Sequence, residues 1–262
     1  MELGLRGRRA IVTGGSRGIG RACAIELARE GVDVVVVGRD EALLGAAVRE
    51  VHAFGVRGGS VSADLSTAEG CALAVRAGLD LLGGVDILVN SAGAATIGPI
   101  LDLPVRAIED ALALKTFGYL RMSQLVVPHM REQRWGRIVN IAGGAGTSPT
   151  ATNIPTSLAN AGVLNITRAL SDAVSKDGIT VNVICPGLTN TGRARDMARL
   201  AADRQGRPVE EVVQEMARSL PAGRMAEPEE IARVAVFLAS EAASYVHGSS
   251  VYMDGGSRRS TP

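Results

Sequence analysis

The stretch "TGGSRGIG", residues 13–20, decides the fold, because it closes the apolar run "AIVTG" and opens the helical run "RACAIELARE". Its glycine spacing predicts a tight turn at Gly14, an approach of backbone amides to a ligand at Gly18, and close packing of helix on strand at Gly20. Backbone N–H groups at the start of a helix bind phosphate groups well. The loop therefore predicts a pyrophosphate site at the end of the first strand.

Short β-branched runs alternate with helical patterns along the rest of the chain. The runs include "DVVVVG" (33–38), "DILVN" (86–90), "RIVNIA" (137–142), "TVNVIC" (180–185) and "SVYMDG" (250–255). Strands that are apolar throughout are covered on both faces, and helical crossovers make them parallel. The pattern predicts an α/β protein with a Rossmann-type, doubly wound, seven-stranded parallel sheet and helices on both faces.

One domain over residues 1–262 is the expected organisation, since no linker or repeat interrupts this rhythm. The least regular segment, 188–224, is rich in Arg and Ala and is predicted to contain a helix near 208–219. We interpret it as a substrate lid.

Composition narrows the class of function. The net charge of +1 argues against a nucleic-acid or membrane-surface role. The cysteines Cys23, Cys71 and Cys185 show neither disulfide nor metal-ligand spacing, so they are expected to be buried thiols in a reducing cytoplasm, and no metal site is expected. The first strand starts within ten residues of the N-terminus and no run is long enough for a membrane span, which predicts a cytoplasmic protein.

Four further motifs occur in order along the chain: "ADLS" (63–66), "NSAG" (90–93), "NVICPGLTNT" (182–191) and the tail from 228 to 256. With the glycine loop they resemble the short-chain dehydrogenase/reductase superfamily over almost the whole chain. The resemblance implies an oxidoreductase whose nicotinamide cofactor lies along these motifs. The cofactor-binding residues that it implies are Gly14, Ser16, Arg17, Gly18, Ile19, Gly20, Arg39, Asp64, Leu65, Asn90, Ala92, Gly93, Pro186, Gly187 and Thr191.

Charge after the second strand predicts which cofactor is used. NAD-specific members of the superfamily place an acid there for the ribose hydroxyls, and an acid would repel a 2′-phosphate. This chain has Gly38 and then Arg39, with Arg17 as a second cation in the glycine loop. NADP(H) is therefore favoured. The alternative is that Arg39 and Asp40 form only a solvated turn.

The resemblance also implies where four catalytic residues would stand, and this chain has other residues there. The position of the serine falls on Gly143, that of the tyrosine on Thr156, that of the lysine on Asn160, and that of the asparagine on Lys115. A threonine hydroxyl is too weak an acid to replace a phenol with a pKa near ~10. Lys and Asn have exchanged places between two helices expected to face one pocket.

Our hypothesis is that Lys115 supplies positive charge and a proton to a developing oxyanion, while Thr156 and Asn160 orient the substrate. The alternative is that Lys115 extends to solvent or pairs with an acid at an interface. Tyr119 is interpreted as a core residue. A solvated helix face is expected for the arginines of 188–224, with contact to an anionic substrate as the alternative: Arg193, Arg195, Arg199, Arg204 and Arg207.

Two functions follow. The preferred one is an NADP(H)-dependent oxidoreductase acting on a small molecule, a carbonyl, alcohol or enone, through a non-standard active site. The rival is a catalytically silent subunit or nucleotide-binding regulator. In both cases the long helices are expected to form a homodimer or homotetramer, or a hetero-oligomer with an active relative.

Overall fold

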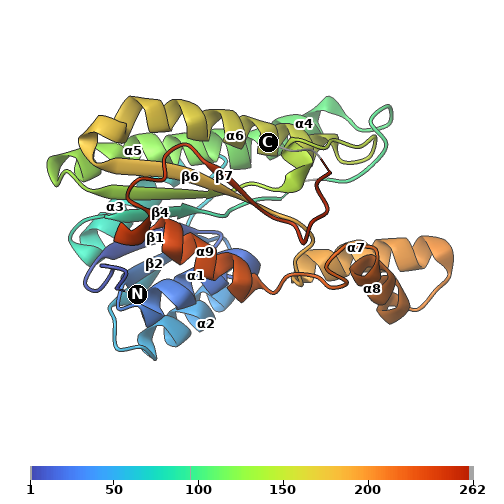
Figure 1. The fold of residues 1–262 in the computed structure, drawn as a ribbon, viewed down its shortest axis with the longest axis horizontal. Coiled ribbons are helices and arrows are strands. Elements are labelled where there is room, and N and C mark those ends of the chain that lie inside the picture. Colours follow the sequence, from blue (N-terminus) through green and yellow to red (C-terminus); the bar gives the residue numbers. More distant parts are fainter. Residues whose placement is uncertain (1, 95, 260–262) are drawn as a thin grey trace.

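The computed structural model describes residues 2–94 and 96–259, and these form one parallel sheet with helices on both faces (Figure 1). The strand order is β3-β2-β1-β4-β5-β6-β7, in seven strands that all pair in parallel. The order reverses direction between β1 and β4, as in a doubly wound sheet. The predicted fold class is confirmed.

The strands are β1 Arg9–Thr13, β2 Asp33–Gly38, β3 Gly58–Ser62, β4 Ile87–Asn90, β5 Gly136–Ile141, β6 Ile179–Pro186 and β7 Ser250–Met253. The α-helices are α1 Gly18–Arg29, α2 Glu41–His52, α3 Ala68–Leu82, α4 Val105–Ala111, α5 Gly118–Glu132, α6 Ile154–Val174, α7 Gly192–Gln205, α8 Val209–Arg218 and α9 Pro228–Leu238. A π-helix, η1 Leu112–Phe117, joins α4 to α5, and short 3₁₀ turns occupy Gly144–Gly146, Ser175–Asp177 and Glu241–Ala243.

Successive side chains of one strand enter different cores, because they point to opposite faces of the sheet. In β2, Val34 and Val36 pack with α1, α2 and α9, whereas Val35 and Val37 pack with α3 and α5. Figure 1 shows these two helical layers below and above the strands. Burial on both faces is why the strands read as unbroken Val and Ile runs.

Helices α7 and α8 stand apart from the two layers and project beyond the carboxyl ends of the strands (Figure 1). They pack on each other through a small cluster that includes Ala198, Ala202 and Val212. The predicted helix near 208–219 is confirmed as α8. The segment is more regular than expected, however, because α7 also forms, capped by the Thr191 hydroxyl, which accepts a hydrogen bond from the Ala194 amide at 3.4 Å.

The opposite edge of the sheet, where the strands begin, is held by charged groups around Trp135. Arg8 lies 3.7 Å and Arg137 lies 4.3 Å from the centroid of the Trp135 ring. Glu241 accepts a hydrogen bond from Trp135 Nε1 at 2.5 Å and one from Arg137 at 3.2 Å. This aromatic and ionic cluster ties β5 to the segment that precedes β7.

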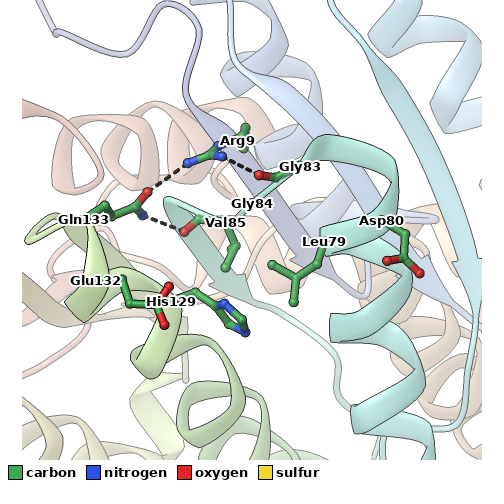
Figure 2. Close-up of a pocket in the computed structure, with 9 residues that line it drawn as sticks. All are labelled: Arg9, Leu79, Asp80, Gly83, Gly84, Val85, His129, Glu132 and Gln133. Carbon is green, nitrogen blue, oxygen red and sulfur yellow. Dashed lines mark hydrogen bonds between the residues drawn. The ribbon is translucent and has the colours of Figure 1, made fainter.

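A surface hollow at the same edge is lined by residues from β1, α3 and α5 (Figure 2). Its polar groups bind one another: Arg9 donates to Gly83 O at 2.8 Å and to Gln133 Oε1 at 2.8 Å, and Gln133 donates to Val85 O at 2.8 Å. Arg9 also pairs with the buried Asp86 at 2.7 Å. These hydrogen bonds satisfy backbone carbonyl groups at the end of α3 and just before β4, so the polar groups of the hollow have a structural role.

Candidate active site

The glycine loop after β1 has the backbone geometry that its sequence predicts. Gly14 and Gly18 have φ values of 64° and 56°, where residues with a Cβ are strained. A Cβ on Gly20 would lie 2.3 Å from Gly14 O, and one on Gly14 would lie 2.9 Å from the Ala92 backbone. The loop therefore packs directly against the turn that follows β4.

Thr13 fixes that turn. Its hydroxyl accepts hydrogen bonds from the amides of Ser91 at 2.9 Å and Ala92 at 3.3 Å. In the same turn Asn90 is fully buried and donates to Asn140 Oδ1 at 2.9 Å, while its own Oδ1 has no partner among the described residues. The predicted residues Asn90, Ala92 and Gly93 thus lie beside the predicted glycine loop.

The ends of β2 and β3 bring three more predicted residues to this edge. A Cβ on Gly38 would lie 3.4 Å from Ser16 Oγ, so the glycine loop reaches the end of β2. Arg39 follows and is exposed, as is Arg17. Hydrogen bonds from the Ser66 amide and hydroxyl lower the pKa of Asp64, and the charge of Arg39 lowers it further. Leu65 is buried next to Asp64, and its carbonyl oxygen would lie 2.8 Å from a Cβ on Gly118.

Pro186, Gly187 and Thr191 complete the set on the loop after β6. Pro186 is the last residue of the strand, and a Cβ on Gly187 would lie 2.7 Å from Asp254 Cα, so only glycine fits against the turn after β7. Thr191 stands opposite the glycine loop, since a Cβ on Gly18 would lie 3.4 Å from its Cγ2. Ile19 packs on the core beneath α1. All the predicted cofactor-binding residues therefore gather at the carboxyl edge of the sheet.

Lys115 lies in the π-helix η1, half-buried, and its amine donates to Ala142 O at 3.2 Å. A Cβ on Gly93 would lie 3.7 Å from Lys115 Nζ, so the amine reaches the turn after β4. No described carboxylate pairs with it. Burial and the nearby charge of Arg193 lower the pKa of the amine to about 7.

Asn160 lies on α6, which packs against η1 through the residues next to Asn160 and Lys115. Thr116 donates its hydroxyl proton to Ala159 O at 3.1 Å, and its side chain packs where a Cβ on Gly162 would stand. Asn160 is 2% exposed, and its Oδ1 has no hydrogen-bond partner in the described part of the chain. A Cβ on Gly143 would lie 2.9 Å from Asn160 Nδ2, so Gly143 leaves the space that the amide occupies.

Thr156 lies in the first turn of α6, one turn before Asn160, and is half-buried. Its hydroxyl accepts a hydrogen bond from Arg193, at the start of α7, at 3.3 Å. Lys115 and Asn160 thus lie at the end of β5, against Ala142 and Gly143, whereas Thr156 lies one turn away on α6 and contacts Arg193.

Two other reactive side chains lie nearby. Tyr119 is 1% exposed and donates its phenol proton to Ile141 O at 3.1 Å, so it is a core residue as predicted, and burial raises its pKa. Burial also raises the pKa of the Cys185 thiol to about 11, although a hydrogen bond from the Gly143 amide and the charge of Lys115 act in the opposite direction. All three cysteines are buried and unpaired, as expected.

Comparison with known proteins places this arrangement in a family. Residues 14–258 match the family model described as enoyl-(acyl carrier protein) reductase. The chain belongs to the short-chain dehydrogenase/reductase superfamily. Superfamily relatives include a 3-oxoacyl-[acyl-carrier-protein] reductase of Aquifex aeolicus, 33% identical over 98% of this chain and 99% of that protein. A short-chain reductase protein of Streptomyces niveus is 36% identical over 94% of this chain and 92% of its own length.

A solved structure of the same superfamily shows the fold in full. L-sorbose reductase from Gluconobacter frateurii, crystallised with NADPH and L-sorbose, superposes with a TM-score of 0.95 at 33% identity and covers 100% of both chains. Since the match covers both chains completely, it includes α7 and α8 as well as the sheet.

Thr13 and Thr116 are residues at this edge that sequence reasoning did not single out, although both lie within or next to superfamily motifs, whereas Arg193 was considered only as one of five arginines of 188–224. A threonine at the end of a buried strand is a weak signal for Thr13. Nothing local marks Thr116, or the bond of Arg193 to Thr156, because the partners Ala159 and Thr156 are distant in sequence. Within the described ranges, no helix is long and apolar enough to cross a membrane and no acidic, His or Cys group could hold a metal ion.

Proposed function

We propose that the chain is an NADP(H)-dependent oxidoreductase that acts on a carbonyl, alcohol or conjugated enone through Lys115 in place of the superfamily's usual catalytic set. The proposal assigns the positions of the family serine, tyrosine, lysine and asparagine to Gly143, Thr156, Asn160 and Lys115. The observation that carries it is the Lys115 amine, which reaches Ala142 and the turn at Gly93 at the carboxyl edge of the sheet. Ligands of doubly wound sheets bind at that edge.

The residues present fit a dinucleotide. The glycine loop offers backbone amides at a helix start. The space beside Gly18 is free except for Thr191, which is the one residue that a Cβ there would meet within 4 Å. Asn90 and Asn160 each hold a buried Oδ1 without a partner in residues 2–94 and 96–259, and an unpartnered buried acceptor costs stability unless a ligand donates to it. Arg39 at the end of β2 favours a 2′-phosphate. When bound, the nicotinamide supplies the hydride.

The chain's own residues would then handle charge and protons. A ketone that gains hydride develops negative charge on its oxygen, and Lys115 lies where a cation can offset it. Because burial brings its pKa to about 7, the ammonium can give up a proton near neutral pH and regain one from solvent. Thr156 contributes a hydroxyl and Asn160 an amide for orientation. In enone reduction the hydride would add to the β-carbon, the ammonium would stabilise the enolate oxygen, and the α-carbon would take a proton from solvent.

The decisive experiment compares the two lysines of the chain, Lys115 and Lys176, of which Lys176 is exposed in the turn after α6. NADPH binding is measured by fluorescence titration, and NADPH oxidation is then followed over a panel of ketones and enones. We expect Lys115→Met to bind NADPH but to lose about 10²-fold or more in kcat, as for loss of a general acid. Lys176→Met should match the wild type. Full turnover by Lys115→Met would exclude the proposed role.

The second candidate is a silent subunit that binds nucleotide and pairs with an active relative. It is supported by apolar side chains exposed on the helices that carry the site, Phe117 at 48% and Leu158 at 45%. It is also supported by the hydrogen bond of the Tyr119 phenol to Ile141 O, which keeps this phenol from serving as a proton donor. NADPH binding with no turnover on any of the panel, in the chain alone and mixed with a relative, would favour it. In either case we propose that 188–224 acts as a lid and that the long helices form an oligomer.

A further inference from the structure

Two arginines of α7 and the turn after it form ion pairs. Arg199 pairs with Asp196 at 3.7 Å, and Arg207 pairs with Glu211 at 3.7 Å and Glu215 at 2.6 Å. These are neutralised on the helix surface, as the sequence suggested. Arg193, Arg195 and Arg204 have no carboxylate of the described residues within ion-pair distance, but among these three only Arg193 has a side-chain hydrogen bond to another element. Its one side-chain hydrogen bond runs out of α7 to Thr156 Oγ1, at 3.3 Å.

Arg193 and Lys115 are two cations directed at one place. The Arg193 charge acts on the Lys115 amine strongly enough to lower its pKa, and burial lowers the pKa of Arg193 itself. From β6 this place is faced by the Cys185 thiol, which burial keeps protonated, and from α6 by Thr156 and Asn160, which are neutral. Asp254, after β7, accepts bonds from the Gly256 and Arg258 amides of its own turn at 3.0 Å, and the charge of Arg258 acts on Cys185 in the direction opposite to that of Asp254. The site therefore holds excess positive charge.

Resting on the proposed function, we infer that the substrate is an oxo acid or enone acid whose carboxylate is bound by Arg193 while Lys115 faces the group to be reduced. A guanidinium binds a carboxylate through two parallel N–H bonds, which are shorter and stronger than its single bond to a neutral hydroxyl. The carboxylate thus displaces Thr156 as the partner of Arg193. It also neutralises the repulsion between the two cations.

The position of Arg193 separates this substrate from the cofactor. Thr191 lies against Gly18 of the glycine loop, but the guanidinium of Arg193 extends to α6, on the side of Lys115 and Asn160. It is therefore placed toward the reacting groups rather than toward the phosphate-binding loop. Because Arg193 belongs to the first turn of α7, carboxylate binding also fixes α7 over the substrate.

The test uses matched pairs of an acid and its methyl ester, 4-oxopentanoate as the ketone and 4-oxopent-2-enoate as the enone. In the wild type we expect kcat/KM for the acid to exceed that for the ester by about 10- to 100-fold. Arg193→Met should abolish this preference through KM and leave the Kd of NADPH unchanged, and Arg193→Lys should restore part of it. The matched control is Arg195→Met, because Arg195 is exposed, as Arg193 is, but lies on the opposite side of the same helix turn.

The outcomes separate this inference from the proposed function. Equal turnover of acid and ester overturns the role of Arg193 and leaves the NADPH-dependent reduction standing. Weaker NADPH binding in Arg193→Met, with the acid preference kept, would assign the arginine to a cofactor phosphate and overturn it too. Where no member of the panel turns over, calorimetric titration of 4-oxopentanoate decides: binding that Arg193→Met abolishes supports the inference, and absence of binding refutes it.

Discussion

The protonation of the Lys115 amine is expected to make the rate of reduction fall as pH rises. Burial and Arg193 lower its pKa to about 7, so it carries a proton below neutral pH and loses it above. If the ammonium is the acid, kcat/KM for NADPH-dependent reduction should be flat near pH 6 and fall about tenfold per unit at high pH, with a midpoint near 7. A rate profile from pH 5.5 to 9 checks this. A plateau that extends through pH 9 would contradict it.

The same amine makes stability depend on pH without any substrate. In the unfolded chain the lysine keeps a pKa near its ordinary value of 10.5, and in the folded chain the value is about 7. Between these values the unfolded state binds more protons, so the contribution of this group favours folding as pH rises. Lys115→Met should therefore raise Tm relative to the wild type most below pH 7, and its advantage should shrink towards pH 10. Lys176→Met should show no such trend.

Gly143 and Asn160 share one space and should behave as a coupled pair. A serine at 143 would bring its Cβ within 2.9 Å of Asn160 Nδ2, so Gly143→Ser is expected to cost about 1–2 kcal/mol of unfolding free energy. In the Asn160→Ala background the same change should cost much less, which chemical denaturation of the four chains would measure. Gly144→Ser is the control, because a Cβ there meets nothing within 4 Å. Simple additivity would show that the two residues are independent.

At the level of elements, the turn after β2 is expected to set the choice of cofactor. Arg39 is exposed, makes no side-chain hydrogen bond to described residues, and acts on Asp64. Arg39→Asp should reduce the preference for NADPH over NADH by about 10- to 100-fold, since it removes a phosphate contact and adds repulsion. Fluorescence titration with both nucleotides gives the ratio. Arg49→Asp, the same charge change on the exposed side of α2, should leave the ratio unaltered.

The regular elements could be predicted from the sequence because each follows from local pattern. Buried strands give continuous Val and Ile runs. The glycine spacing predicts a tight turn at Gly14, and the structure has the positive φ there that favours glycine. The motifs follow the predicted strands, so the residues predicted to bind the cofactor were expected at the carboxyl edge of the sheet. The bond from Thr116 to Ala159 and that from Arg193 to Thr156 join distant segments, so no periodicity predicts them. The helix α7 was missed because its surface is mostly charged and its apolar side is made only of alanines.

For the molecule as a whole, the Trp135 cluster and the candidate active site lie at opposite ends of the strands. Trp135 lies between Arg8 and Arg137 at the edge where strands begin, far from the glycine loop at the ends of the same strands. Trp135→Leu should lower the unfolding free energy by about 2–3 kcal/mol through lost burial and cation–π contacts. The Kd for NADPH should stay unchanged. Tyr245→Leu is the control, since Tyr245 is 97% exposed and its loss should not affect stability.

The π-helix η1 has a consequence for how the direction of Lys115 can be changed. A π turn closes its hydrogen bonds over five residues instead of four, so it holds one residue more in each turn than an α-helix does. We expect that deleting one residue from 112–114 would let α4 and α5 continue as one α-helix and would turn Lys115 by about 100° about the helix axis relative to α4, which would loosen its contact with Ala142. The direction of the amine is thus encoded by chain length and not by residue type. Point substitutions do not change the number of residues in η1, whereas single-residue deletions in 112–117 change it and so change the direction of Lys115.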